Sequence, residues 1–373
     1  MEEWKEYRLG EVVAMKNGKK HPTEEGLYPV YGGNGIMGYV SSYNSENTII
    51  IGRVGAYCGN VYYCKGKCWV SDNAISVKTN DDFNIVFLFY LMQTLNLHNQ
   101  HIGGAQPLMT QDIIGNFNIR VPSLRIQDKI ALTLSLFDDK IVLNQKINSN
   151  LEEQAKALFK SWFIDFEPFK GGKFVDSELG KIPEGWKVTT IGDVTDNIKD
   201  KVGDRDNIKV LSPITSGQLV LSEDYFSKQV FSNSIAKYIV VKHNDFAYNP
   251  ARINIGSIGM NEFDFDGCVS PVYVVFRCQK GYEYFFDLYR RTTFFTEEVK
   301  KRAIGGVRQT LSYKDLSLIQ LVYPPKKVIN VFNSIYISLL HSIHSNDVSN
   351  KKLEVLRDTL LPRLMSGDIE VRS

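Results

Sequence analysis

The sequence lacks the features of a membrane protein and of a disulfide-bonded protein. No apolar run is long enough to cross a bilayer, and residues 1–6 do not have the character of a signal peptide. Five cysteines in 373 residues are an odd number, which is typical of reduced thiols rather than of a disulfide framework. We therefore expect a cytoplasmic, globular protein of two or three domains.

A strong excess of charge of one sign is also missing. The chain has 44 Lys and Arg against 42 Asp and Glu, a formal net charge of +2. A nucleic-acid-binding protein with this balance has to gather its basic residues on one face. Net charge therefore neither predicts nor excludes DNA or RNA as a partner.

Recognisable catalytic and metal-binding motifs are absent from the sequence. No Gly-x-x-x-x-Gly-Lys-Ser/Thr phosphate loop occurs, and the glycine-rich residues 32–35 are better explained as a turn. Residues 249–252 match the Asn-Pro-Pro-aromatic loop of amino-methyltransferases only in their first two positions, and no glycine-rich turn for a methyl donor precedes them. The spacing of Cys58, Cys64 and Cys68 is not the Cys-x-x-Cys spacing of a structural zinc site. We therefore predict a non-catalytic chain that binds no metal and no cofactor itself.

What the sequence does contain is a heptad pattern between residues 126 and 169, which predicts a long helix that buries one narrow stripe against another helix. The apolar positions are Ile130, Leu134, Phe137, Ile141, Leu151, Ala155, Leu158 and Trp162, with Asn144 and Asn148 on the same stripe. Adding 202 to these numbers gives a second stripe, from Phe332 to Leu364, in which Tyr336 and Arg357 are the departures. Buried Asn residues accept only a partner that can hydrogen-bond to them, so they fix the register of a parallel or an antiparallel pair. The residues expected to form the pairing are Ile141, Asn144, Asn148, Leu151, Ile343, Asn346, Asn350 and Leu353.

The parts of the chain that precede each helix are repeated as well. The pattern Trp4-Lys5-x-x-x-Leu9-Gly10 returns 182 residues later as Trp186-Lys187-x-x-x-Ile191-Gly192. The offset grows to 199 at Val70 and Val269, to 202 at Gly103 and Gly305 and to 203 at Leu108 and Leu311, and it settles at 202 in the helix. The repeat therefore predicts two homologous units. The second unit has insertions in its globular part but none in its helix.

Each globular part, which we call a head, is predicted to be mixed, with strands predominant. Strands are expected around residues 48–51, 61–63 and 74–77 of the first head and around 210–211, 238–241 and 272–276 of the second. Helical segments are expected from Phe83 to Leu97 and from Tyr282 to Lys301. The prolines at 122 and at 324–325 suit the entrance of each long helix.

Both heads also carry basic, amide and aromatic side chains among glycines in loop-like stretches. Arg can fork onto guanine, Asn or Gln onto adenine, and Lys meets phosphates as a point charge. Any one of these side chains could equally be a solvated loop charge. The recurrence of a Gly-Gly pair followed by a polar residue, Gln106 or Arg308, favours contact with DNA. The candidates are Lys16, Lys19, Lys20, Arg53, Tyr57, Lys65 and Gln106 in the first head, and Lys199, Lys201, Arg205, Arg252, Asn254, Arg308 and Gln309 in the second.

Several motifs resemble those of the specificity subunit of type I restriction-modification systems, over the whole length of the chain. Phe159-x-x-Trp162-Phe163-x-Asp165-Phe166-x-Pro168-Phe169 is similar to the end of that family's central conserved helix. Ser177-Glu178-Leu179-Gly180-Lys181-Ile182-Pro183-Glu184-Gly185-Trp186 is similar to the lead-in to its second recognition domain. Leu360-Leu361-Pro362-Arg363-Leu364-Met365-Ser366-Gly367 resembles the close of its distal helix. Gly52-Arg53 and Gly103-Gly104-Ala105-Gln106-Pro107 also resemble segments of its recognition domains.

This resemblance implies an α+β fold with two homologous target recognition domains, each followed by a long helix. The two helices would pair as an antiparallel coiled-coil spacer. The expected segments are a first recognition domain (1–122), a central helix (123–170), a linker (171–185), a second recognition domain (186–325) and a distal helix (326–373). Each recognition domain would read one half of an asymmetric, split DNA site.

The family also implies partner subunits. Two methylation subunits would bind S-adenosylmethionine and methylate adenine, and motor-nuclease restriction subunits would use ATP and Mg²⁺. We expect the methylation subunits to dock on the apolar and aromatic ends of the helices, at Phe159, Trp162, Phe163, Leu361 and Leu364.

Two other functional classes remain open from the residues alone. An enzyme with its own methyltransferase or nuclease activity would need the donor-binding and catalytic motifs that are missing. A coiled-coil scaffold that joins protein partners would show no sequence-dependent affinity for DNA. The repeated basic, glycine-rich loops speak against the scaffold.

Overall fold

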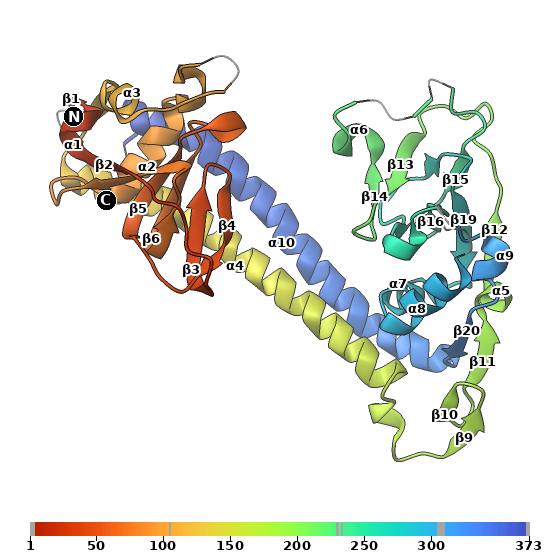
Figure 1. The fold of residues 1–373 in the computed structure, drawn as a ribbon. Helices are drawn as coiled ribbons and strands as arrows, with labels where there is room; N and C mark the ends of the chain where they lie inside the picture. Colours follow the sequence, from red (N-terminus) through yellow and green to blue (C-terminus); the bar gives the residue numbers. More distant parts are fainter. Residues whose placement is uncertain (1–3, 104–105, 229–230, 233, 304–309, 371–373) are drawn as a thin grey trace. The chain divides into compact units, whose positions relative to one another are not determined.

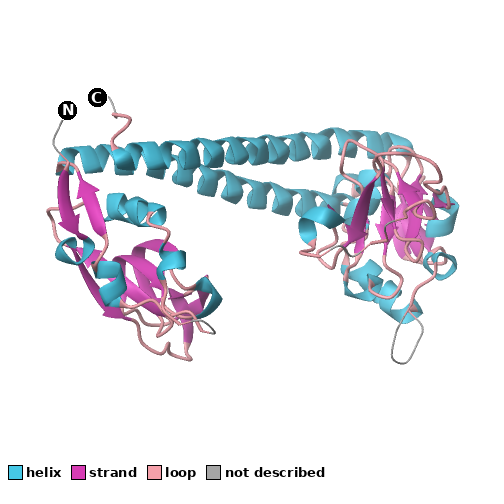
Figure 2. Ribbon diagram, turned by 90° about the horizontal axis from the view of Figure 1, so that it is seen from above, coloured by secondary structure: helices cyan, strands magenta, loops and turns pink. Residues whose placement is uncertain are grey.

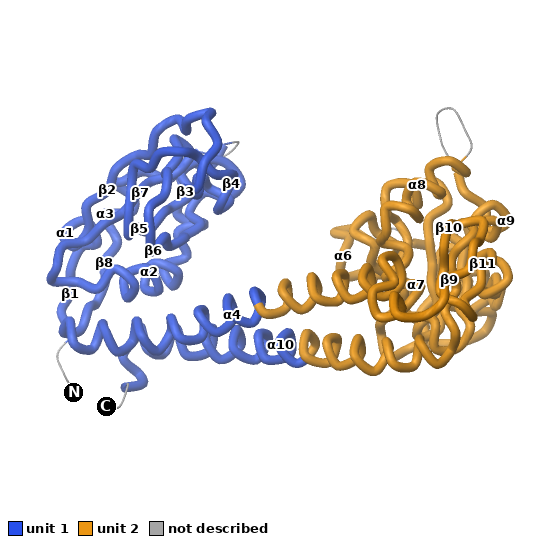
Figure 3. The backbone as a smooth tube through the Cα atoms, turned by 90° about the horizontal axis from the view of Figure 1, so that it is seen from below, with its two compact units in different colours: residues 1–146, 345–373 blue, residues 147–344 orange. Residues whose placement is uncertain are grey.

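In the computed structural model, residues 4–103, 106–228, 231–232, 234–303 and 310–370 are described. The chain divides into two compact units (Figure 3). Unit 1 consists of residues 1–146 and 345–373, and unit 2 of residues 147–344. Each unit therefore combines one head with one part of each long helix. Among the described residues, no helix has both the length and the hydropathy of a membrane-spanning segment.

The head of unit 1 is built on a six-stranded sheet with the order β2-β7-β5-β6-β3-β4. Its central strands are rich in β-branched residues, and Ile49, Ile50 and Ile51 are completely buried. The sheet consists of β2 (Val13–Asn17), β3 (Glu25–Gly32), β4 (Gly35–Val40), β5 (Ser45–Gly52), β6 (Val61–Val70) and β7 (Ala74–Thr79).

Helix α2 (Ile85–Thr94) contributes its apolar residues to the same core as this sheet. Asn84 begins the helix because its side chain accepts hydrogen bonds from the backbone amides of Val86 and Phe87. The head is completed by β1 (Lys5–Arg8), α1 (Leu9–Val12), η1 (Gly55–Tyr57), η2 (Leu97–Gln100), α3 (Gln111–Gly115) and β8 (Asn118–Val121).

The head of unit 2 contains two four-stranded sheets, ordered β12-β19-β16-β17 and β14-β13-β18-β15. The first sheet consists of β12 (Thr195–Ile198), β16 (Phe246–Tyr248), β17 (Ile258–Met260) and β19 (Val274–Cys278). The second consists of β13 (Lys209–Pro213), β14 (Leu219–Leu221), β15 (Ile239–Val241) and β18 (Gly267–Val269). Two antiparallel pairs, β9 (Phe174–Ser177) with β10 (Gly180–Pro183) and β11 (Lys187–Thr190) with β20 (Gln320–Tyr323), complete the strands.

The helices of this head are short (Figure 1). They are η3 (Glu167–Phe169), α5 (Ile191–Val194), α6 (Ser222–Tyr225), η4 (Ile253–Ile255), α7 (Glu283–Tyr289), α8 (Thr293–Arg302) and α9 (Tyr313–Leu316). The continuous helix expected from Tyr282 to Lys301 is wrong, because the chain breaks between α7 and α8. Thr292 causes the second start, since its side chain accepts a hydrogen bond from the amide of Phe295.

The two heads share one framework, which confirms the internal repeat. In each, the first strand pairs antiparallel with the last, β1 with β8 and β11 with β20. A four-residue helix follows the first strand, and the next strand pairs antiparallel, β2 with β7 and β12 with β19. The part of unit 2 in which the offset grows holds β13, β14, α6 and β15. The insertions expected from the sequence therefore lie in the head.

The long helices are α4 (Leu124–Phe163), of 40 residues, and α10 (Lys326–Ser366), of 41 residues. Figure 2 shows both as continuous cyan ribbons. Within unit 1 the amide nitrogen of Asn144 donates to Oδ1 of Asn350 at 2.8 Å, and within unit 2 the amide nitrogen of Asn148 donates to the carbonyl oxygen of Ile343 at 3.4 Å. Within unit 1, Asp138 of α4 also contacts Arg357 of α10, so the residue numbers fall along α10 as they rise along α4, and the pairing is antiparallel.

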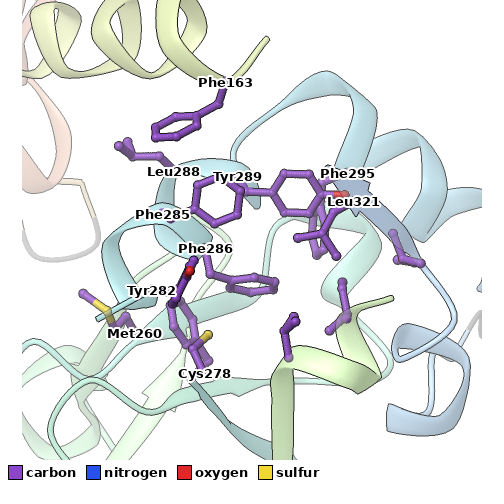
Figure 4. Close-up of a cluster of buried hydrophobic side chains, with 14 of the residues drawn as sticks. Phe163, Met260, Cys278, Tyr282, Phe285, Phe286, Leu288, Tyr289, Phe295 and Leu321 are labelled. Carbon is purple, nitrogen blue, oxygen red and sulfur yellow. The ribbon is translucent and has the colours of Figure 1, made fainter. Parts of the chain in front are cut away.

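Both helices bury apolar residues in the core of a head. In unit 1, Ile130 and Leu134 of α4 and Leu364 of α10 belong to the core that contains α2. In unit 2, the aromatic core is larger and includes Phe163, whose ring lies 5.1 Å from that of Phe285 (Figure 4). Each head is therefore anchored on the part of the helix pair that belongs to its own unit.

Candidate nucleic-acid interface

The loop that follows β5 in the first head is held tightly against its neighbours. The amide of Gly52 donates to the carbonyl oxygen of Asn60, and the amide of Gly59 donates to the carbonyl oxygen of Gly52, both at 2.8 Å. A Cβ atom on Gly52 would lie 2.2 Å from the carbonyl oxygen of Tyr57, so only glycine fits at this position. The side chain of Tyr57 is left 47 % exposed at the end of η1.

Arg53 connects this loop to two others. Its amide donates to the carbonyl oxygen of Asn73, and its carbonyl oxygen accepts from the amide of Met109, both at 2.8 Å. The guanidinium reaches the carbonyl oxygen of Asp72 at 3.4 Å, and the residue is half-buried. A neutral carbonyl does not compensate the charge, so the guanidinium keeps most of its capacity to bind an anion or a base edge.

Backbone hydrogen bonds join four loops of unit 1 into one group, which we call the first loop cluster (residues 17–20, 52–60, 70–73 and 106–109). The amide of Lys19 donates to the carbonyl oxygen of Val70 at 3.0 Å, and that of Gly55 to the carbonyl oxygen of Pro107 at 3.0 Å. The cluster therefore brings together Lys19, Lys20, Arg53, Tyr57 and Gln106, of which all but Arg53 are exposed.

Two other candidates in the first head lie outside these loops. Lys16 is exposed on β2, opposite Ser76 of β7. Lys65 is exposed in the middle of β6, beside an irregular part of its pairing with β5. Neither Lys16 nor Lys65 takes part in the backbone hydrogen bonds that join the loops of the first loop cluster.

The corresponding loop of the second head follows β16. The amide of Asn249 donates to the carbonyl oxygen of Ser257 at 3.0 Å, and η4 fills the loop. The amide of Leu311 donates to the carbonyl oxygen of Pro250 at 3.1 Å, just as that of Met109 donates to Arg53. Pro250 therefore stands where the first head has Arg53. The basic residue of this loop is Arg252, which is exposed, and Asn254 is half-buried nearby.

Three further candidates of the second head lie on the segment between β12 and β13. Lys199 and Lys201 are exposed, and Lys201 forms an isolated bridge with Ile239. The guanidinium of Arg205 donates two hydrogen bonds to the carboxylate of Asp200, both at 3.0 Å. This pairing raises the pKa of Arg205 and lowers the pKa of Asp200. Arg205 is consequently a weaker candidate than Arg252, because its charge is already compensated. Arg308 and Gln309 lie outside the described residues.

Titratable groups do not gather into a metal site in the part of the chain that the structure describes. All five cysteines are buried and free. The interaction between the thiols of Cys64 and Cys68 lowers the pKa of Cys64 and raises that of Cys68. Cys64 and Cys68 belong to a small apolar cluster with Ile50, Val70 and Ala74, as expected for reduced, structural cysteines.

Comparison with known proteins agrees with this architecture. A family model described as the type I restriction modification DNA specificity domain matches residues 1–153. The MjaIX specificity subunit of Methanocaldococcus jannaschii is 28 % identical over 303 residues, which cover 76 % of this chain and 69 % of the relative. The HindI specificity subunit of Haemophilus influenzae is 25 % identical over 342 residues, which cover 71 % of this chain and 72 % of the relative. The resemblance to type I specificity subunits that the sequence motifs predict is thus confirmed.

A solved structure also shares the fold of this chain. The S subunit of a type I restriction-modification system from M. genitalium aligns with a TM-score of 0.64 and 15 % identity, over 98 % of this chain and 96 % of the other. The expected α+β fold with two homologous heads and long helices is thus confirmed. The family model that matches residues 1–153 describes a DNA specificity domain, and the relatives named here are specificity subunits.

The expected docking role of the helix ends needs correction. Phe159 and Phe163 are 4 % and 7 % exposed in the core of unit 2, and Leu364 is 3 % exposed in the core of unit 1. Trp162 and Leu361 are half-buried against the same two cores. These side chains attach the heads to the chain's own helices, so they are not free to bind a partner. The sequence pattern located an apolar contact correctly but assigned it to the wrong neighbour.

Residues of the first loop cluster were also missed in the sequence. The glycine-rich turn at residues 32–35, interpreted as a plain turn, lies against the cluster, since the Cα of Gly33 is 3.1 Å from the position a Cβ of Gly52 would take. Asn34 is exposed in this turn, and Asp72 and Asn73 are exposed beside Arg53. The signal that could have identified them is the amide side chains of Asn34, Asn60 and Asn73 in the three loops that follow the neighbouring strands β3, β5 and β6.

Proposed function

We propose that this specificity subunit reads a split DNA site, one half with each head, and that the two halves differ in sequence. The observation that supports this most is the shared framework with different loop chemistry. The loop after β5 carries Arg53 and Tyr57 and is hydrogen-bonded to the loop of Gln106, whereas the loop after β16 has Pro250 in place of Arg53 and carries Arg252 instead. Side chains that meet base edges decide which sequence is read, so heads with different loops would select different half-sites.

The helix pair would act as the spacer between the two heads. A helix of 40 residues is about 60 Å long at ~1.5 Å per residue. Half-sites one to two turns of DNA apart, at roughly 34 Å per turn, are within the reach of such a spacer. The hydrogen bond between Asn144 and Asn350 is buried, and a buried Asn pair fixes one register of two helices.

Partner subunits belong to this proposal as well. Two methylation subunits would supply S-adenosylmethionine binding and adenine methylation, and restriction subunits would supply ATP- and Mg²⁺-dependent motor and nuclease activity. Because the helix ends are buried, we place docking of a methylation subunit on the exposed leucines of α4. Leu132, Leu136 and Leu143 are 61 %, 59 % and 51 % exposed and are spaced by four and seven residues, which puts them on one face of the helix.

The proposed readout is tested by substitution of one arginine in each head. In the complex with its methylation subunits, Arg53→Ala is expected to weaken binding and relax discrimination at the first half-site only, and Arg252→Ala at the second only. Loss of a bidentate base contact costs about 1–3 kcal/mol. Fluorescence anisotropy with DNA duplexes that carry every single-base change in each half-site measures both effects.

Arg205→Ala serves as the matched control, since Arg205 is exposed but already bound to Asp200. It should change affinity little and discrimination not at all. An Arg53→Ala variant that binds all half-site variants as the wild type does would remove Arg53 from the interface. Equal binding of every DNA sequence by the wild-type complex would contradict the proposed function and favour a scaffold.

The docking surface has its own test. Leu136→Asp places a charge in the middle of the exposed stripe, and we expect it to abolish co-purification of a methylation subunit while the fold of the chain is kept. Gln145→Glu is the control, because it adds a negative charge at an exposed position on another face of α4. Equal recovery of the methylation subunit with both variants would show that this stripe is not the docking surface.

A further inference from the structure

One position of the helix stripe differs between the two halves of the chain in a way that the repeat does not explain. Arg357 of α10 corresponds to Ala155 of α4, and Asp138 of α4 corresponds to Leu340 of α10, both at the offset of 202. In unit 2, Ala155 is buried and Leu340 is half-buried, and both pack in the aromatic core. At the corresponding level of its helices, unit 1 has the opposite charges of Asp138 and Arg357 in place of these two apolar residues.

The carboxylate of Asp138 joins three elements of unit 1. One of its oxygens accepts from Nη1 of Arg357 at 2.5 Å. The other accepts from the hydroxyl of Tyr90. Tyr90 lies on α2, which belongs to the head, and it is 2 % exposed. A single side chain on α4 therefore connects the first head with α10.

The same helix of the head is tied to α4 at a second level. The amide of Asn84 donates to Oε1 of Gln127 at 2.9 Å, and its side-chain nitrogen donates to the carboxylate of Asp128 at 2.7 Å. Gln127 is 2 % exposed, so its hydrogen bond is protected from water. Helix α2 is thus fixed on the helix pair by directional polar contacts at its first turn and again at Tyr90.

The second head is attached in a different way. Rings of Phe159 and Phe163 on α4, Phe285 on α7 and Phe332 on α10 lie 4.8–6.3 Å from their neighbours. Apolar packing fills space but sets angles less strictly than hydrogen bonds do, because it is non-directional. Unit 2 also has a polar contact, from the side-chain amide of Asn333 on α10 to the carbonyl oxygen of Gly281 at 2.8 Å, but Leu340 offers no polar group at the level of Asp138. The charged contact at Asp138 is therefore particular to the first head.

We propose that Tyr90, Asp138 and Arg357 form a joint that fixes the orientation of the first head on the helices and so determines how strictly the protein selects the length of the DNA spacer. This inference depends on the proposed function, since it needs a split site. Base contacts stay within the head, so the joint acts on spacing and not on the half-site sequence. The three residues are positioning residues that do not touch DNA.

The test uses two variants in the complex with the methylation subunits. Asp138→Leu combined with Arg357→Ala gives unit 1 the residues that unit 2 has at this level, and leaves no unpaired charge. Tyr90→Phe removes one hydroxyl and keeps the buried ring. We measure binding to duplexes whose spacer is the preferred length or one base pair shorter or longer, well below the unfolding temperature of each variant.

For the double variant, the preference for the correct spacer is expected to fall roughly tenfold, the scale of one charge-assisted hydrogen bond. Tyr90→Phe should give a smaller loss in the same direction. Discrimination against single-base changes in either half-site should stay at the wild-type level. A general loss of stability would instead lower this discrimination together with the spacer preference. Glu153→Gln with Lys156→Ala is the control, because it removes an exposed ion pair on α4.

Two failures are distinguishable in this design. If the wild-type complex shows no split site, the proposed function fails. If it shows a split site but the double variant keeps the wild-type spacer preference, the proposed joint is overturned and the proposed function stands. Loss of half-site discrimination together with spacer preference would also overturn the joint, since it would show that the variants disturb the head itself.

Discussion

Substitution of Asp287 with alanine is expected to lower the free energy of unfolding of unit 2 by about 3–5 kcal/mol, the usual cost of removing one partner of a buried ion pair. The side chains of Asp287 and Arg290 are 1 % and 4 % exposed. The guanidinium donates to Oδ1 of Asp287 through Nε at 2.9 Å and Nη2 at 2.5 Å. It also donates to the carbonyl oxygens of Ile258 and Gly217, both at 2.9 Å.

The cost arises from the charge that is left behind. Burial lowers the pKa of Arg290, which shows that its charged form is already disfavoured by its surroundings. Without the carboxylate, the guanidinium would remain buried with only neutral carbonyl partners. These carbonyls belong to the loop at residue 217 and to β17, so the loss would also loosen α7 from the sheet.

Urea denaturation followed by fluorescence measures this effect. Trp4→Phe and Trp69→Phe in both proteins leave Trp162 and Trp186 as reporters of unit 2. Asp287→Leu combined with Arg290→Met is the matched variant, because it leaves no fully buried guanidinium unpaired and should cost much less than the single change. Arg291, which also donates to Asp287, is 44 % exposed and can be solvated in both variants. A single variant that loses less than about 1 kcal/mol would contradict the structural role of the pair.

Insertion of one heptad into each long helix is expected to lengthen the preferred DNA spacer by about three base pairs. Seven residues add about 10 Å at ~1.5 Å each, and base pairs are ~3.4 Å apart. Insertions after Lys146 and after His344 lie at the boundaries of the units, so they keep the contacts of Asn144 with Asn350 and of Asn148 with Ile343. Neither half-site should change, because no residue of a head is altered.

A lower affinity should accompany the longer spacer. Three base pairs rotate one half-site by roughly 100° about the DNA axis, at ~10.5 base pairs per turn, whereas a heptad keeps the helix stripe aligned. The DNA or the helices must then twist to bring both heads into register. Methylation sequencing of cells that carry the insertion variant reads out spacer and half-sites together. An unchanged spacer with altered half-sites would refute the role of the helices as a spacer.

Much of the fold could be predicted from the sequence because its main signals are periodic. The stripe from Ile130 to Trp162 recurs at a constant offset, and it predicts both long helices and their polar centre. Pro122 and Pro325 locate the helix starts to within two residues. The repeated Trp-Lys segment predicts two related heads, and the structure pairs both copies with the last strand of their head.

Other features depend on contacts that no local pattern encodes. The stripe is compatible with parallel and antiparallel pairing, and the contacts of Asn144 with Asn350 and of Asp138 with Arg357 decide between them. The apolar face that contains Phe159 and Phe163 predicts that these side chains are buried in a contact. It does not tell whether the contact is with another protein or with the chain's own head. The same limit applies to Arg205, whose partner Asp200 compensates a charge that the sequence presents as available.

The candidate interface was predicted only in part for a related reason. Glycine and basic residues mark Arg53 and Arg252 as loop residues. Which loops meet depends on strand order, and the first loop cluster combines segments as far apart as Lys19 and Gln106. The equivalence of Arg53 with Pro250 likewise appears only from matching backbone hydrogen bonds.

The central claim, that one chain reads two different half-sites, is tested most directly by mapping adenine methylation across the genome. Cells that contain this chain and its methylation subunit are compared with cells that lack only this chain. We predict a new methylated motif made of two short, different sequences separated by a gap of fixed length. A single continuous motif, or no motif that depends on this chain, would contradict the claim.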